Sequence, residues 1–234
     1  MWVWNPVRPK GRKEPVNKLL AEALGTFGIV FAGTGAIVVD QLTNQTIGHS
    51  GIALTFGLIV AAMIYAFGDI SGAHFNPAVT VAFALAGRFA WKHVFRFILA
   101  QLAGALVGSL LLRFLFPSAL TLGGTIPMGP AYQSFVLEVV LTFLLMLVIL
   151  RVSTGAREKG ITAGLAIGAV VALEAMFAGP ICGASMNPAR SFAPAAVVGE
   201  WASLWIYLIA PTLGGALAVP VNAALHSGPA PHKL

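Results

Sequence analysis

The chain contains the tripeptide Asn-Pro-Ala twice, at Asn76, Pro77 and Ala78 and again at Asn187, Pro188 and Ala189. In each copy an asparagine that can cap a helix precedes a proline that suits the first helical position, so each copy predicts the start of a helix. The apolar segment after the first copy ends near Gly87 and spans about 15 Å. A helix of that length crosses only half of a bilayer, and we expect the second copy to enter from the opposite side.

Two such half-helices would meet near the middle of the membrane. Each N-terminus carries about half a positive charge, and the side-chain amides of Asn76 and Asn187 would add hydrogen-bond donors. The residues before each tripeptide must be extended, so that their carbonyls form a ladder of acceptors. This predicted ladder includes Gly72, Ala73, His74, Gly183 and Ser185. Such a lining binds neutral hydrogen-bonding solutes and repels cations and protons; two chance Asn-Pro turns in loops are the alternative.

Four ionisable residues lie inside or beside apolar segments. Arg190 directly follows the second tripeptide, and a cation at membrane depth is by default functional, although an arginine that snorkels to the interface is the alternative. Glu22 and Glu138 share the spacing Glu-x-x-x-Thr-Phe, and we interpret both as acceptors for unpaired loop backbone rather than as proton relays. Glu174 is predicted either to have a partner in a neighbouring helix or subunit or to face the vestibule.

Two further residues lie close to the tripeptides. His74 precedes Asn76 by two residues and is expected to line the cytoplasmic half of a pore, where gating by its protonation is one hypothesis. Cys182, the single cysteine, excludes an intramolecular disulfide. Mercury bound to it would block a pore, and a buried, inert thiol is the alternative. No nucleophile–base pair, metal cluster or phosphate loop is visible in the sequence, which argues against an enzyme.

These residues must be positioned by membrane helices. Of 234 residues, 58% are hydrophobic and only 9% are charged, whereas soluble domains carry about 25% charged residues. Six apolar stretches are long enough to span a bilayer, near 19–39, 51–68, 94–116, 132–150, 161–178 and 202–224. Two shorter stretches, near 76–86 and 187–198, reach about half as far. The first long stretch exceeds the apolar core of a signal peptide and lacks an Ala-x-Ala cleavage pattern.

The two halves of the chain resemble each other. The segment 71–78 (SGAHFNPA) is echoed by 182–189 (CGASMNPA), and 100–104 (AQLAG) by 210–214 (APTLG). Each half holds three spans, so the second must cross the membrane in the opposite sense, which points to a site near the midplane. We therefore predict an all-α membrane protein with six transmembrane helices and two half-helices, built as an inverted repeat of two three-helix halves. Residues 1–18 would form a cytoplasmic N-terminal segment and 19–234 one channel domain, with repeats at about 19–116 and 131–225.

The net charge of +6 follows from topology. If six helices alternate, one side of the membrane receives Arg8, Lys10, Arg12, Lys13, Lys18, Arg88, Lys92, Arg96, Arg151, Arg157, Lys159 and Lys233. The loops of the other side, 40–50, 117–130 and 199–201, contain no lysine or arginine. The positive-inside rule then places both termini in the cytoplasm, and the basic charge implies no nucleic-acid partner.

The segments SGAHFNPAVT and GASMNPARS resemble the paired signature of the aquaporin (major intrinsic protein) family, and the similarity extends over nearly the whole chain. This resemblance implies a homotetramer with one pore per subunit in a lipid bilayer, most simply the plasma (inner) membrane, with no cofactor and no catalysis. It also implies a selectivity filter on the extracellular side of the tripeptides. The four filter positions are Phe56, Ala175, Ala184 and Arg190.

The filter departs from that of the family's strict water channels, which carry histidine where this chain has Ala175. Alanine is smaller and lacks a donor, so the resemblance favours a wider ring that admits glycerol, urea or undissociated metalloid hydroxides as well as water. Ser191 and Ala195 instead resemble the water-channel type, whereas Tyr207 resembles the nodulin-like plant channels. A strict water channel is therefore the alternative, and a coupled secondary transporter or an ion channel is a more distant one.

Overall fold

The computed structural model describes residues 14–153 and 157–226. Within these residues it contains eight helices and no strand, which confirms the predicted all-α class. Six helices are long and apolar enough to cross a membrane: α1 (Glu14–Leu42), α2 (Gly48–Ser71), α4 (Trp91–Leu115), α5 (Ala131–Val152), α6 (Arg157–Cys182) and α8 (Leu204–His226). Two are short, α3 (Pro77–Leu85) and α7 (Pro188–Val198), and both follow an Asn-Pro-Ala asparagine.

The first helix begins earlier than the apolar stretch that predicts it. α1 begins at Glu14, so residues 14–18 belong to a helix rather than to the predicted N-terminal segment. Pro15 does not prevent this, because proline is tolerated in the first turn of a helix. Residues 1–13, with four of the predicted cytoplasmic cations, lie outside the described residues, as do Lys233 and the side chains of Arg157 and Lys159.

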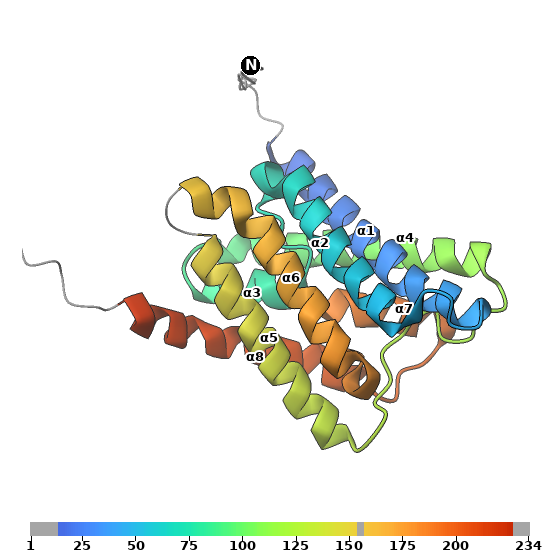
Figure 1. Cartoon of the computed structure of the whole chain (residues 1–234). Coiled ribbons are helices and arrows are strands. Elements are labelled where there is room, and N and C mark those ends of the chain that lie inside the picture. The colour runs from blue at the N-terminus through green and yellow to red at the C-terminus, as the bar shows by residue number, and fades with distance from the viewer. Residues whose placement is uncertain (1–13, 154–156, 227–234) are drawn as a thin grey trace, which may run out of the picture.

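The two halves pack in the same way. α1 lies against α2 and α4, and α5 lies correspondingly against α6 and α8. The halves join through α2 with α6, and each short helix contacts the last long helix of the opposite half, α3 with α8 and α7 with α4. Figure 1 shows α2 and α6 running side by side. Because each half-helix is held by the other half, neither half encloses its own Asn-Pro-Ala site alone.

Glycine permits the closest helix contacts. A Cβ at Gly104 of α4 would overlap the carbonyl oxygen of Ala23 on α1. Gly57 of α2 and Gly168 of α6 face each other in the same way, since a Cβ on either would overlap the carbonyl oxygen of the other. Small residues let membrane helices approach until their backbones touch, and the second pair fixes α2 against α6 where the two halves meet.

Candidate functional site

Both asparagines of the tripeptides cap the helices that follow them. Asn76 has an extended backbone, and its Oδ1 accepts a hydrogen bond from Ala78 N at 2.9 Å at the start of α3. Asn187 Oδ1 accepts from Ala189 N at 3.0 Å and from Arg190 N at 3.4 Å at the start of α7. Each amide oxygen is therefore committed to capping, which fixes the direction of the amide nitrogen.

The amide nitrogens hold the two loops together. Asn76 Nδ2 donates to the carbonyl of Met186 at 2.7 Å, and Asn187 Nδ2 donates to the carbonyl of Phe75 at 2.9 Å. A side-chain amide has two N–H donors, so each asparagine keeps one donor beyond this crosswise pair. Both asparagines line the cavity described next, so the remaining donors can serve a molecule inside it.

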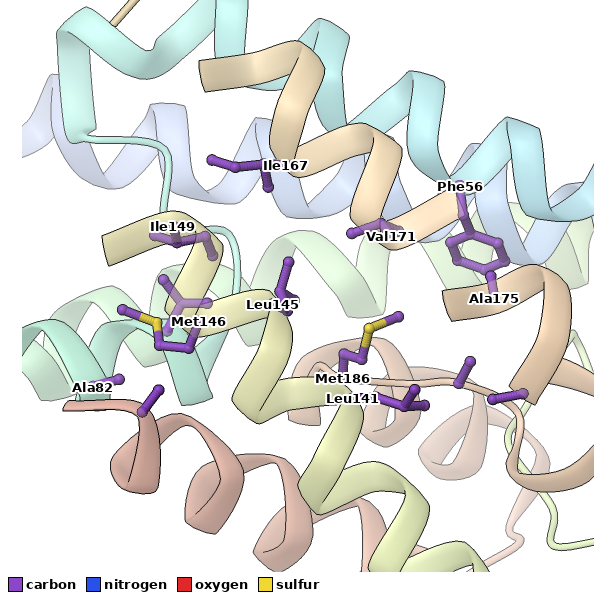
Figure 2. Packing of buried hydrophobic residues seen from close by; sticks show 14 of the residues in the cluster. Phe56, Ala82, Leu141, Leu145, Met146, Ile149, Ile167, Val171, Ala175 and Met186 are labelled. Atoms are coloured by element: carbon purple, nitrogen blue, oxygen red, sulfur yellow. The ribbon is translucent and has the colours of Figure 1, made fainter. Parts of the chain in front are cut away.

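A cavity of about 640 Å³ is lined by residues of both halves. All four predicted filter residues line it, as do Gly72, Ala73, His74 and Ser185 of the predicted carbonyl ladder. Gly183 and the Pro-Ala pairs of the tripeptides do not line it. Its other wall is apolar and comes from α1, α2, α3, α5 and α6; Figure 2 shows Leu145, Ile149, Ile167 and Val171 along α5 and α6, with Phe56 and Ala175 close together. One side of the cavity thus presents hydrogen-bonding groups of the loops, and the other side presents apolar side chains of the helices.

The loops before the tripeptides have an unusual backbone. Ala73, Phe75, Ala184 and Met186 have φ values of 51°, 50°, 39° and 53°, in the left-handed region that only glycine visits readily. Each costs about 1–2 kcal/mol, and such strain persists only where surrounding contacts enforce it. The residue types at these positions do not predict this conformation, because none of the four is glycine. It is what turns successive carbonyls of the loops away from a regular helix or strand.

The Glu22 carboxylate holds the first loop. Its Oε1 accepts from Ser71 Oγ at 2.6 Å and from His74 N at 3.0 Å, while its Oε2 accepts from Phe75 N at 2.7 Å and from Gln101 Nε2 at 2.7 Å. Four donors and no acceptor face the carboxyl group, which matches its ionised form. Sequence reasoning missed Gln101, although the comparison of AQLAG with APTLG shows a glutamine where the second half has proline.

Glu138 holds the second loop with fewer bonds. Its two oxygens accept from Ser185 N at 2.7 Å and Met186 N at 2.8 Å. The positions that correspond to Ser71 and Gln101 are Cys182 and Pro211, which offer a weak thiol donor and no donor. The carboxylates of both halves therefore bind loop backbone, and the second is held less firmly.

Arg190 is buried beside the filter. Its side chain is 3% exposed, one guanidinium nitrogen (Nη1) donates to the carbonyl of Gly123 at 2.8 Å, and its Cζ lies 5.1 Å from the ring centroid of Phe56. A snorkelling arginine would place its head group in water, which this burial excludes. Gly123 lies in the connection between α4 and α5, a partner that sequence reasoning missed because the two residues are 67 positions apart.

His74 lines the cavity and packs against three aromatic rings. The ring centroids of Phe83, Phe89 and Phe97 lie 4.8, 4.8 and 5.2 Å from that of the imidazole. Burial in this setting lowers the pKa of His74 to about 3, so the ring is neutral at physiological pH. Its Nδ1 lies 3.2 Å from Thr80 Oγ1, whose own proton goes to Asn76 O, so Nδ1 is the protonated nitrogen.

Glu174 and Cys182 are both buried. Glu174 is 3% exposed, does not line the cavity, and its Oε2 has no hydrogen-bond partner among the described residues. The interpretation that Glu174 faces the vestibule is therefore wrong. Ala175, the next residue of α6, lines the cavity, and the side chain of Glu174 points in another direction. Cys182 is fully buried at the end of α6, which agrees with the inert thiol rather than with a pore-lining one.

Comparison with known proteins gives matches over most of the chain. Residues 11–221 match the family model described as "Major intrinsic protein". The chain is 48% identical over 200 residues to aquaporin NIP1-1 of Zea mays, covering 85% of this chain and 71% of that protein. It is 46% identical to nodulin-26 of Glycine max, covering 85% and 74%. The structure is similar to that of the aquaglyceroporin from Plasmodium falciparum, with a TM-score of 0.82 and 25% identity over 91% of this chain and 97% of that one.

Proposed function

This chain belongs to the major intrinsic protein family, the aquaporins, and we propose that it conducts water together with small neutral solutes such as glycerol, urea or undissociated metalloid hydroxides, and excludes ions and protons. Its relatives are membrane channels rather than enzymes. What remains to be argued from the site is which solutes the channel conducts.

The observation that carries the solute range is that two of the four filter residues, Ala175 and Ala184, are alanines. Only Phe56 and Arg190 add bulk to the ring, and these two side chains contact each other. A polyol passing this ring would turn its hydroxyl groups toward Arg190 and the loop carbonyls and its carbon chain toward the apolar wall. Sites that combine hydrocarbon with a few placed polar groups orient small ligands in this way.

Ion exclusion is proposed from three features that add up. The N-termini of α3 and α7 present their positive ends to the cavity, Asn76 and Asn187 offer donors there, and Arg190 adds a full positive charge. A cation would have to lose its hydration water against this field. Neither Glu22 nor Glu138 lines the cavity, and both carboxylates bind loop backbone, so neither offers a ligand to a cation there. The same engagement argues against a coupled transporter that uses either carboxylate.

A strict water channel is the second candidate. The contact of Phe56 with Arg190 favours it, because a phenyl ring held 5.1 Å from the guanidinium carbon narrows one side of the ring. The two candidates differ in a single observable, glycerol flux.

Stopped-flow light scattering on proteoliposomes separates the candidates. We expect fast shrinkage in sucrose and fast re-swelling in glycerol, compared with empty vesicles. Ala175→His should abolish re-swelling in glycerol while sparing the shrinkage, because the imidazole fills the open side of the ring. Ala175→Ser, which changes the volume little, should retain both phases. Re-swelling of the parent protein no faster than that of empty vesicles would establish the strict water channel instead.

We further propose a homotetramer in a plasma (inner) membrane with both termini cytoplasmic. Lys18, Arg88 and Arg96 support this orientation, since they line one and the same cavity at one end of the helices. Arg113, in the last turn of α4 at the opposite end, is an exception to the charge asymmetry. Its Nη1 donates to the carbonyl of Ala119 at 2.8 Å, so it stabilises the chain that leaves α4.

A further inference from the structure

Helix α6 contains a proline near its end. Pro180 has no N–H, so it cannot donate to the carbonyl of Met176, its partner in a regular helix. The helix nevertheless continues to Cys182. The carbonyl of Met176 is therefore free to accept a hydrogen bond from another donor.

His49 supplies that donor from another helix. It is the second residue of α2, and its Nε2 lies 2.6 Å from the carbonyl oxygen of Met176. A carbonyl only accepts, so Nε2 carries the proton. Gly179 makes room for the ring, because a Cβ at that position would lie 3.0 Å from His49 Cε1. Three residues thus act together. Pro180 leaves the Met176 carbonyl without its helical donor, His49 donates to that carbonyl, and Gly179 leaves space for the imidazole ring.

The bond joins the two helices that carry the neighbouring filter residues Phe56 and Ala175. Phe56 lies seven residues after His49 on α2, and Ala175 directly precedes Met176 on α6. Nearer the middle of these helices, the Gly57–Gly168 contact fixes α2 against α6 at one point. The Tyr65 hydroxyl accepts a hydrogen bond from Leu165 N at 3.2 Å and joins the two helices at the end away from the filter. The His49–Met176 bond joins them at the end of α6 that carries Ala175, so it constrains the angle between the helices on the filter side. The distance between Phe56 and Ala175 depends on that angle.

We propose that His49 is a positioning residue for the selectivity filter: it replaces the hydrogen bond that Pro180 removes from α6 and thereby sets the width between Phe56 and Ala175. The proposal rests on the proposed channel function and adds a determinant of selectivity outside the pore.

A double-mutant cycle tests the proposal, with the glycerol-to-water permeability ratio of proteoliposomes as the measurement. His49→Ala should change this ratio by about two- to tenfold, the factor in a conformational equilibrium that one hydrogen bond is worth. Pro180→Ala restores an N–H for the Met176 carbonyl. In that background His49→Ala should leave the ratio unchanged, because the carbonyl no longer needs the histidine.

Two controls separate positioning from general stability. His49→Gln retains a side-chain N–H donor and should keep the ratio closer to that of the parent than His49→Ala does. Ser50→Ala changes the exposed neighbour of His49 and should have no effect. An unchanged ratio in His49→Ala, or an equal change with and without Pro180, would overturn the proposal.

Failure of the His49 proposal can be distinguished from failure of the proposed solute range. If the parent protein excludes glycerol, the proposed solute range fails, and the same four proteins are then compared by water permeability alone. If His49→Ala does not fold, recovery of folded protein in the His49→Ala/Pro180→Ala variant supports the pairing. Failure of both variants to fold contradicts it, since the restored N–H would have made the histidine dispensable.

Discussion

Glu22 accepts more hydrogen bonds than Glu138, and this difference predicts how much stability the substitution Glu22→Gln removes. Glutamine has nearly the same shape as glutamate, but it replaces one carboxylate oxygen by an NH₂ group. In either orientation that group points at a backbone N–H, from His74 if it takes the place of Oε1 or from Phe75 if it takes the place of Oε2. One buried backbone donor then loses its acceptor, and the remaining bonds lose their ionic character.

The magnitude follows from the number of bonds. A buried donor left without an acceptor costs about 1–3 kcal/mol, and each remaining bond falls from the charged to the neutral class, a loss of about 1 kcal/mol. With four donors on Glu22, one is stranded and three bonds are weakened, so the total is about 4–6 kcal/mol. Glu138→Gln also strands one donor but has one other backbone bond to weaken, so it should cost about 2–4 kcal/mol.

Thermal unfolding in detergent, followed by fluorescence-detected size-exclusion chromatography, measures this order. We expect the unfolding temperature of Glu22→Gln to fall by about 10 °C and that of Glu138→Gln by less. Glu174→Gln is the matched control, because its buried carboxyl has one oxygen without a donor and loses little on neutralisation. A Glu22→Gln protein as stable as the parent, or a Glu174→Gln protein as destabilised as Glu22→Gln, would refute the reasoning.

Three other predictions concern packing, thiol chemistry and pH. Gly104→Ala should destabilise the fold by about 3 kcal/mol, since the new methyl group meets backbone rather than a side chain that can move, and thermal unfolding measures this. A mercurial reagent should leave water permeability unchanged, because Cys182 is fully buried. Water permeability measured by stopped flow should be constant from about pH 5 to pH 8 as far as His74 is concerned, because a pKa lowered to about 3 keeps its imidazole neutral there.

Each of these predictions has a contrary result. Gly68→Ala, in a helix position with open space around it, should be neutral, so equal destabilisation by both alanines would contradict the packing argument. Inhibition by mercury that disappears in Cys182→Ser would show that the thiol is reached. A fall in permeability between about pH 7 and pH 5 that disappears in His74→Ala would show that the histidine titrates in spite of its aromatic surroundings.

Features that depend on short-range sequence could be predicted. The starts of α3 and α7 follow from an asparagine cap and a proline within two residues, and the structure places both helices within a residue of the predicted positions. The roles expected for Glu22 and Glu138 came from equal spacing in both halves, and both carboxylates do accept from loop backbone. Local sequence signals and internal repeats can both be recognised without knowledge of the fold.

Features that depend on long-range contact could not be predicted. The left-handed backbone at Ala73 and Met186 has no signal in the residue types, because neither is glycine. The apolar wall was also hidden, since helices surrounded by lipid are apolar on every face and their periodicity does not mark the inner one. The donor that replaces the bond lost at Pro180, His49, lies 127 residues before the carbonyl it binds. Such pairings are determined by the folded chain alone.

The crosswise bonds between the loops have a consequence for how this protein could be divided or built. Asn76 donates to a loop of the second half and Asn187 to a loop of the first, so each half carries a donor whose acceptor belongs to the other. Two polypeptides cut within the connection at residues 116–130 should therefore be degraded when either is produced alone and accumulate when both are present.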